Sequence, residues 1–426
     1  MITPIKISNE DSKAGSLFRM ADGKNLFITF ALVTSLFLLW GFCNGMIDIL
    51  NKHFQDSLHI NKAQSGLVQF ANYIAYFLMA IPAGLLARKF GYKGGIIIGL
   101  LLISGGAFWF IPATHIGTYW AFLTGLFIVA AGMTCLETIA NPYTTLLGAV
   151  DSGATRINIA QTFNGVGWIL GPIVGGHFVF GSGEGANADA GLYIPYLGVA
   201  IVVTVLIVVF VMVDVPDLRA EEEVKGEAEG KARKPLWRRS HFTFGVAAQF
   251  AYVAAQTGIL SFFVNYVLEN DPGVTKMQAS TWLGAIGFGL FMFGRLCGSA
   301  VISQSKPHRV LAAYAAINIL LTALTMGGGK LGLYALFGSF FFMSIMFPTI
   351  FALGIRGLGE HTKLGSSLIV MSIVGGAIAA PLMGHIADIS SMRAGFALPM
   401  ICFLFISIYG IVWPKLDAMD RMSQNR

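Results

Sequence analysis

The feature that most constrains this chain is a series of apolar runs, each about 20 residues long, between residues 27 and 414. A helix of about that length spans the hydrocarbon core of a bilayer, which is roughly 30 Å thick. The chain is 55% hydrophobic and only 12% charged, with a mean hydropathy of +0.70. A soluble domain carries about 25% charged residues. The sequence therefore predicts an all-α integral membrane protein.

The apolar runs predict twelve transmembrane helices. We expect them at residues 27–50, 65–87, 94–112, 117–147, 157–181, 190–213, 242–268, 278–302, 309–326, 331–354, 365–388 and 395–414. The first run follows a polar leader and is longer than the apolar core of a signal peptide, and no small-residue cleavage site lies nearby. We therefore expect it to be a transmembrane helix and not a cleaved signal.

The distribution of Lys and Arg predicts the orientation. If the N-terminus is cytoplasmic, most of these cations fall in cytoplasmic segments, and the opposite loops hold only Lys52, Lys62, Lys276, Lys330 and Arg393. This asymmetry predicts both termini in the cytoplasm of a multi-pass plasma-membrane protein, with a bacterial inner membrane as the expected location. Topology accounts for the net charge of +6, so no nucleic-acid partner is expected.

One long hydrophilic stretch, residues 219–240, lies between the sixth and seventh predicted helices. It divides the chain into an N-terminal half (1–217), a cytoplasmic linker (218–240) and a C-terminal half (241–426), each half with six helices. The run Gly167 to Gly175 in the fifth helix resembles Gly376 to Gly384 in the eleventh, including a central proline. Six plus six helices with parallel repeats are typical of the major facilitator fold, whose substrate site lies near the midplane. Each chain then holds a complete pathway and is expected to function as a monomer.

Two carboxylates, Asp48 and Glu137, are the acidic residues placed well inside predicted helices. A charge near the bilayer centre costs about 2.5–3.5 kcal/mol on the translocon scale, so it is retained mainly where it faces a polar pathway. Asp48 shares a helix face with Trp40 and Asn44 at spacing four, and Glu137 shares one with Asn141. Two alternatives stay open: Asp48 could lie at the outer mouth, and Glu137 could be a permanently protonated interhelical hydrogen bonder.

Glu137 has no Lys or Arg within a turn or two of its helix. Burial without a cation disfavours the ionised form of a carboxyl group, which could then exchange a proton at cellular pH. The sequence therefore predicts proton coupling through Asp48 and Glu137, with the proton as coupling ion and no further cofactor.

Amide and aromatic side chains recur on the faces of two other predicted helices. One helix carries Gln161, Asn164 and Trp168, and the seventh carries Gln249, Tyr252 and Gln256, with Asn265 further along. Amides both donate and accept hydrogen bonds, which suits sugar hydroxyls. Each amide alone could equally join two helices. The predicted substrate-binding set is Trp40, Asn44, Asp48, Glu137, Asn141, Gln161, Asn164, Gln249, Tyr252, Gln256 and Asn265.

Neither a metal site nor an active site is predicted. The four cysteines, Cys43, Cys135, Cys297 and Cys402, fall in predicted helices without metal-binding spacing, and the eight histidines are scattered. An integral-membrane transferase would need metal ligands or a polar loop holding a nucleophile and base, and neither is visible. We therefore expect a carrier and not an enzyme, in contact with the lipid bilayer and a small-molecule substrate.

The runs Leu136-Glu-Thr-Ile-Ala-Asn-Pro-Tyr143 and Ala160-Gln-Thr-Phe-Asn-Gly-Val-Gly-Trp168 resemble the fucose/glucose/galactose permease branch of the major facilitator superfamily. Further likeness occurs at 37–50, 82–93, 249–263 and 344–350, so the resemblance covers both halves. It is most similar to the L-fucose:proton symporter group. The resemblance implies that Asp48 and Glu137 serve proton coupling and sugar recognition, and that Gln161 lies near the sugar.

The chain departs from that family pattern at two places. Fucose carriers of the group have an Asn-Asn pair where this chain has Asn44-Gly45, which indicates a different sugar. Arg88 stands where the general superfamily loop has an Asp, a loss that the branch shares. Some glucose/galactose members have Gln at the position of Glu137, so its retention here favours coupling.

The sequence therefore predicts monosaccharide:proton symport by alternating access, with L-fucose, a related hexose or an N-acetylhexosamine as substrate. A facilitative sugar uniporter and a sodium-coupled sugar carrier remain alternatives, and a membrane transferase is a more distant one.

Overall fold

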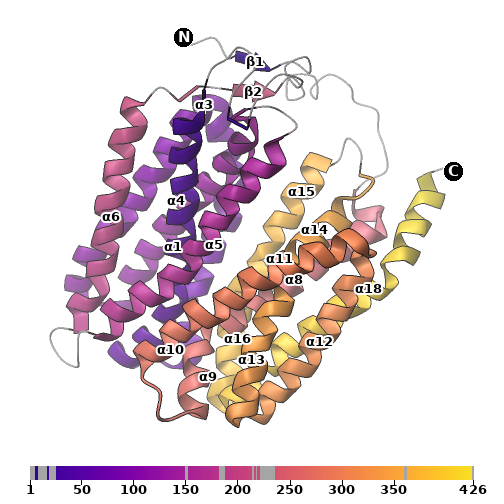
Figure 1. Ribbon diagram of the computed structural model, residues 1–426. Helices are drawn as coiled ribbons and strands as arrows, with labels where there is room; N and C mark the ends of the chain where they lie inside the picture. The colour runs from indigo at the N-terminus through magenta and orange to yellow at the C-terminus, as the bar shows by residue number, and fades with distance from the viewer. Residues whose placement is uncertain are drawn as a thin grey trace. The chain divides into compact units, whose positions relative to one another are not determined.

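The computed structural model describes residues 5–7, 17–18, 25–148, 152–181, 188–213, 215–216, 218–220, 236–358 and 362–424, and these are almost entirely helical (Figure 1). The predicted all-α membrane class is confirmed. A small addition is a parallel pair of three-residue strands, β1 (Ile5–Ile7) and β2 (Leu218–Ala220), which joins the leader to the stretch after the sixth predicted helix.

The described residues of the N-terminal part form six helices. They are α1 (Phe27–Ser57), α2 (Lys62–Ser65), α3 (Leu67–Ile116), α4 (Tyr119–Leu146), α5 (Gly153–Gly181) and α6 (Ala188–Met212). α1 runs seven residues past its predicted end at residue 50, into a polar turn where Lys52 pairs with Asp56 at spacing four. Such pairs support a helix beyond its apolar part, which the search for apolar runs could not detect.

The C-terminal part is more interrupted than predicted. It contains a 3₁₀ turn η3 (Leu236–Arg238), α8 (Ser240–Ser261), α9 (Phe263–Asn270), α10 (Lys276–Trp282), a π-helical turn η4 (Leu283–Phe288), α11 (Gly289–Gln304), α12 (Pro307–Gly327), α13 (Gly329–Met343), α14 (Met346–Ile355), α15 (Thr362–Met371), a 3₁₀ turn η6 (Ser372–Val374), α16 (Gly375–Ile389), α17 (Met392–Gly395) and α18 (Ala397–Gln424). Breaks of this kind inside transmembrane helices are tolerated where neighbouring protein satisfies the backbone.

Among the described residues, ten helices are long and apolar enough to cross a membrane, or eleven if α8 and α9, bent by 49°, form one span. The continuous helix through α2 and α3 counts once in that number, although it covers the two predicted spans 65–87 and 94–112. Gly91 breaks it with φ 72°, a left-handed conformation that favours glycine. Dividing it there raises eleven to twelve, in agreement with the predicted count.

The chain forms two compact units. The first contains Met1–Met46 and Leu78–Lys231, and the second contains Ile47–Phe77 and Ala232–Arg426. The last turns of α1, all of α2 and the first turns of α3 therefore pack with the C-terminal helices, although their chain neighbours belong to the first unit.

In the first unit, glycines let α1 approach α5 closely. A Cβ atom on Gly45 would lie 2.9 Å from both the Pro172 ring and the Trp168 carbonyl oxygen, and one on Gly171 would lie 2.6 Å from the Phe42 carbonyl oxygen. Where no hydrophobic force drives helices together, such small residues permit the backbone contact. Gly45 therefore packs against α5. An asparagine at position 45 would clash with α5 unless the two helices moved apart.

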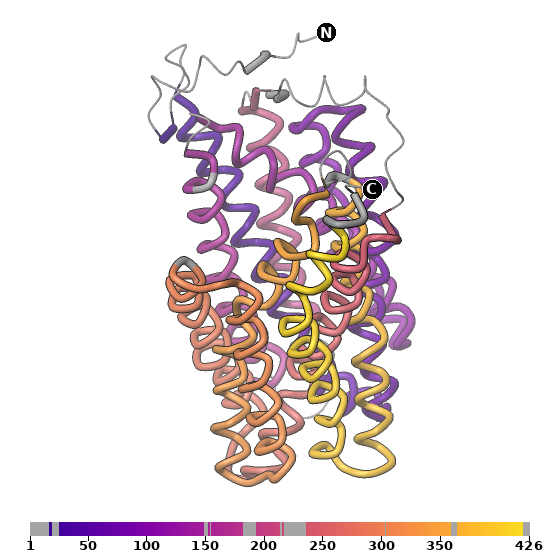
Figure 2. Tube along the Cα trace, turned by 90° about the vertical axis from the view of Figure 1, so that its right-hand side faces the viewer, coloured from indigo at the N-terminus to yellow at the C-terminus, as the bar shows by residue number. Residues whose placement is uncertain are grey.

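In the second unit, α8 packs against α14, α16 and α18, and α18 also packs along α12 (Figure 2). The N-terminus of α8 is held by Asp420 of α18, whose carboxylate accepts the backbone N–H groups of Ser240 (3.0 Å) and His241 (2.9 Å). Asp420 also lies 2.6 Å from Nδ1 of His241. Both side chains are buried, so this contact fixes where α8 starts.

Candidate functional site

Glu137 lies on α4 in the first unit and lines a small cavity with Phe37 and Trp40 of α1. The remaining lining residues are apolar, and the carboxylate is half-buried. Within the described chain, no group forms a hydrogen bond or ion pair with the Glu137 carboxylate. Glu137 and Trp40 thus line the same small, mostly apolar cavity.

Other predicted residues of the first unit mainly connect helices to one another. Gln161 of α5 donates to the Asn141 side chain of α4 at 3.2 Å. Asn164 donates to the Phe37 carbonyl oxygen at 3.1 Å and is buried, so it joins α5 to α1. Asn44 donates to the Trp40 carbonyl oxygen in its own helix at 3.0 Å. The alternative of an interhelical role thus describes Asn164 well, whereas Gln161 and Asn141 are only half-buried.

Asp48 lies in the second unit, 5% exposed and well before the end of α1 at Ser57. Its Oδ1 accepts a hydrogen bond from Nε2 of Gln69 on α3 at 2.9 Å. Its Oδ2 is buried without a hydrogen-bond partner, and so are both polar atoms of Asn51 one turn further along. A buried carboxylate with half of its acceptor capacity unused is the arrangement expected of a group that takes up a ligand hydroxyl or a proton.

Only some of the polar side chains on the predicted face of α8 have hydrogen-bond partners in the protein. Gln249 is fully buried, and neither amide atom has a hydrogen-bond partner. Tyr252 donates to the Met343 carbonyl oxygen at 3.0 Å, which ties α8 to α13. Gln256 is half-buried. An unsatisfied buried amide costs free energy unless a ligand or water satisfies it, so Gln249 is the strongest candidate on this face.

Asn265 on α9 is paired with Gln55 of α1 through both amide groups, at 2.6 and 3.5 Å. This reciprocal pair uses part of the hydrogen-bonding capacity that the sequence assigned to substrate. Asn265 lies beyond the bend at Phe262 that separates α9 from α8.

The predicted residues divide between the two units. Trp40, Asn44, Glu137, Asn141, Gln161 and Asn164 belong to the first, and Asp48, Gln249, Tyr252, Gln256 and Asn265 belong to the second. The two proposed coupling carboxylates are therefore in different units.

Sequence reasoning missed three polar groups in the second unit. Gln69 bonds Asp48, and Tyr73 accepts a hydrogen bond from Thr257 of α8 at 3.0 Å. Both lie on one face of the predicted helix 65–87 at spacing four, a signal that was available. Arg295 of α11 was also missed, although a cation inside a predicted span is as informative as a carboxylate. Its guanidinium lies 5.2 Å from the Phe291 ring centre, and no ion pair to it is found in the described chain.

A cluster of polar contacts holds α2 to the C-terminal helices of the second unit. The Asp388 carboxylate accepts the backbone N–H groups of Lys62 (3.1 Å) and Ala63 (2.9 Å) at the start of α2. The Lys62 ammonium lies 2.9 Å from Glu269, and Lys276 lies 2.7 Å from Asp56. We call this set the α2 contacts.

No group of three or more His, Cys, Asp or Glu side chains in the described residues is arranged to hold a metal ion. The four cysteines are free thiols.

Comparison with known proteins identifies relatives over nearly the whole chain. The family model described as Major Facilitator Superfamily matches residues 26–373. The L-fucose-proton symporter of Escherichia coli (strain K12) is 39% identical over 408 residues, which cover 91% of this chain and 93% of the relative. The glucose/galactose transporter of Brucella abortus biovar 1 (strain 9-941) is 35% identical over 399 residues, or 92% and 95% of the two chains.

Solved structures give the same relationship. A crystal structure of a Major Facilitator Superfamily transporter, FucP, in the outward conformation has a TM-score of 0.66 at 38% identity, covering 91% of this chain and 99% of that one. The crystal structure of a D-xylose-proton symporter has a TM-score of 0.72 at 13% identity, which shows a shared fold alone.

Proposed function

The chain belongs to the Major Facilitator Superfamily, and we propose from this that it carries a monosaccharide across the membrane together with a proton. The named relatives are transporters, so the chain is a transporter and not an enzyme. Relatives named as an L-fucose-proton symporter and as glucose/galactose transporters support a hexose or a related sugar as the substrate.

The observation that carries the proposal is the unpaired carboxylate of Glu137 beside Trp40. A carboxylate inside an apolar span is expensive when ionised, so protonation makes the apolar surroundings tolerable. The indole of Trp40 supplies a flat surface for the C–H face of a sugar. The protonation state of Glu137 and the contact between Trp40 and the sugar are thereby coupled, because both side chains line one cavity.

In the second unit, Asp48 supplies a carboxylate comparable to that of Glu137. Gln69 donates to one carboxylate oxygen, and the other oxygen has no partner. We assign Asp48 and Gln249 to hydrogen bonding with sugar hydroxyls, because Asp48 Oδ2 and both amide atoms of Gln249 are buried without a hydrogen-bond partner in the protein. Gln161 and Asn141 are assigned the same role in the first unit, and Gln256 in the second, since these are half-buried.

Transport would proceed by alternating access, with two six-helix halves (1–217 and 241–426) moving about the central site. The α2 contacts join a segment of the first half, residues 47–77, to helices of the second half. We propose that they close the extracellular end and break when that end opens. This assignment requires both termini to be cytoplasmic in a bacterial inner membrane, as the Lys and Arg distribution predicts. A single chain would suffice, and no cofactor beyond the coupling proton is proposed.

The test compares wild type with Glu137→Gln in proteoliposomes. Uphill accumulation of sugar driven by a pH gradient should be lost in the variant, whereas exchange of labelled for unlabelled sugar across both faces should persist. Accumulation that survives the substitution would remove Glu137 from coupling. Accumulation that follows a sodium gradient and not a pH gradient in wild type would favour the sodium-coupled alternative.

A further inference from the structure

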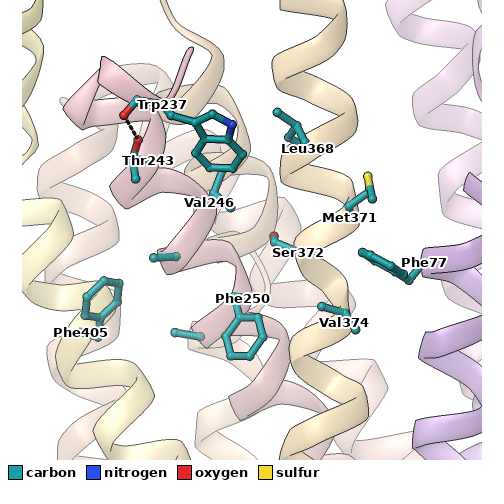
Figure 3. Close-up of a pocket in the computed structure, with 12 residues that line it drawn as sticks. Phe77, Trp237, Thr243, Val246, Phe250, Leu368, Met371, Ser372, Val374 and Phe405 are labelled. Atoms are coloured by element: carbon teal, nitrogen blue, oxygen red, sulfur yellow. Dashed lines mark hydrogen bonds between the residues drawn. The ribbon is translucent and has the colours of Figure 1, made fainter. Parts of the chain in front are cut away.

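A second cavity, of about 670 Å³ and largely open on one side, lies in the second unit (Figure 3). None of the residues assigned to sugar lines it. α8 forms one wall with Val246, Ala247 and Phe250, and the segment from α15 to η6 forms the other with Leu368 and Met371. Its size falls in the range of about 300–1,000 Å³ typical of cavities that hold small molecules.

The chemistry of the lining does not suit a sugar. Apart from the indole N–H of Trp237, the polar side chains among the lining residues are Thr243 and Ser372, and both hydroxyls donate to the protein backbone. Thr243 donates to the carbonyl oxygens of Trp237 (3.1 Å) and Arg239 (3.2 Å), and Ser372 donates to that of Ile369 (2.6 Å). The cavity therefore offers hydrocarbon contacts and almost no hydrogen-bonding capacity.

The cavity also lies on a different face of α8 from Gln249 and Gln256. At about 100° per residue, the lining residues Val246, Phe250 and Ala247 stand about 60°, 100° and 160° around the helix from Gln249, whereas Gln256 stands about 20° from it. Gln249 is fully buried and does not line the cavity. A ligand here would contact α8 beside the face that carries the amides assigned to sugar.

One end of the cavity is formed by Trp237, which is 57% exposed and directly precedes α8 (Figure 3). Tryptophan at a helix end is typical of the boundary between membrane and water. Residues 231–239 include five cations and no carboxylate, namely Lys231, Arg233, Lys234, Arg238 and Arg239. Of these, Arg238 is exposed beside Trp237. Basic residues at such a boundary attract anionic lipid headgroups.

We infer that this cavity binds one acyl chain of an anionic glycerophospholipid, whose phosphate lies at Trp237 and Arg238. The hydrocarbon lining selects the chain, and the positive charge at the end of the cavity selects the headgroup. The site is independent of which sugar or coupling ion the transporter uses, so it stands even if the proposed function is revised.

The test is native mass spectrometry of the purified full chain with phosphatidylglycerol or phosphatidylcholine added. Wild type should retain phosphatidylglycerol preferentially. Ala247→Trp should weaken retention of both lipids, about tenfold if only two methylene groups are excluded. Arg238→Gln should weaken phosphatidylglycerol alone, about fivefold for the loss of one charge. Leu404→Trp, at an exposed position of α18 that does not line the cavity, is the matched control and should bind as wild type does.

A second measurement needs no cavity variant. Phosphatidylglycerol brominated in its acyl chains should quench Trp237 fluorescence, read as the difference between wild type and Trp237→Phe, more strongly than brominated phosphatidylcholine. Equal quenching by the two lipids, or equal retention by Ala247→Trp and Leu404→Trp, would overturn the inference. So would a wild-type dimer that Ala247→Trp dissociates with its lipid retained, because the cavity would then be an interface between copies.

Discussion

The hydrogen bond from Gln69 to Asp48 makes a quantitative prediction about sugar binding. Gln69 donates to Asp48 Oδ1 at 2.9 Å in a buried setting, and Oδ2 has no other donor. This amide therefore fixes the orientation of the Asp48 carboxyl group. Replacing Gln69 with Leu removes it and keeps a side chain of similar length.

A hydrogen bond to a charged group contributes about 1.5–3 kcal/mol. A change of about 1.4 kcal/mol is tenfold in an equilibrium constant. If Gln69 orients Asp48 for the sugar, Gln69→Leu should therefore weaken sugar binding by about ten- to a hundredfold at fixed pH.

The assay is equilibrium binding of radiolabelled sugar to purified protein at one fixed pH. Gln278→Leu is the matched control, because Gln278 is exposed, spends its amide on the capping box of α10, and does not touch Asp48. An unchanged affinity in Gln69→Leu would show that the bond does not orient Asp48 for the sugar. Tighter binding would contradict the sign of the argument.

Three further predictions concern packing and closure. Asp420→Ala removes the buried partner of His241 and should lower the free energy of unfolding by about 3–5 kcal/mol, measured by thermal or denaturant unfolding in detergent; an unchanged transition would contradict it. Gly167→Val forces a side chain against the backbone of α1 and should cost about 1–3 kcal/mol in the same assay, whereas Gly198→Val, with open space around it, should not. Asp388→Asn weakens the α2 contacts and should speed maleimide labelling of a cysteine placed at buried Ser65 about tenfold; equal labelling would show that Asp388 does not hold this end closed.

Much of the fold could be predicted because the bilayer imposes helix length and apolar composition. The membrane class and the number of spans followed from apolar runs, and the close approach of α1 to α5 agrees with the stripe of Gly167 and Gly171. The breaks at Phe262 and at residues 372–374 could not be predicted, because they depend on which neighbouring helix satisfies the freed backbone.

The candidate site shows the limit of reading one helix at a time. Periodicity placed Asn164 on a polar face, and Asn265 was noted further along the seventh helix, but the sequence could not say that one bonds the α1 backbone and the other bonds Gln55. Pairing of polar groups between helices is a tertiary property, so Gln69 was not recognised as the partner of Asp48. The lack of a cation near Glu137 along α4 could be predicted from the sequence, but the lack of a partner from another helix could not.

The most direct test of the account is the external pH of lightly buffered, deenergised vesicles that contain the transporter, recorded as single sugars are added. The account predicts alkalinisation on addition of one sugar or a few related sugars, absent from protein-free vesicles and from Glu137→Gln. Entry of labelled sugar in wild type with no change in pH would contradict proton symport.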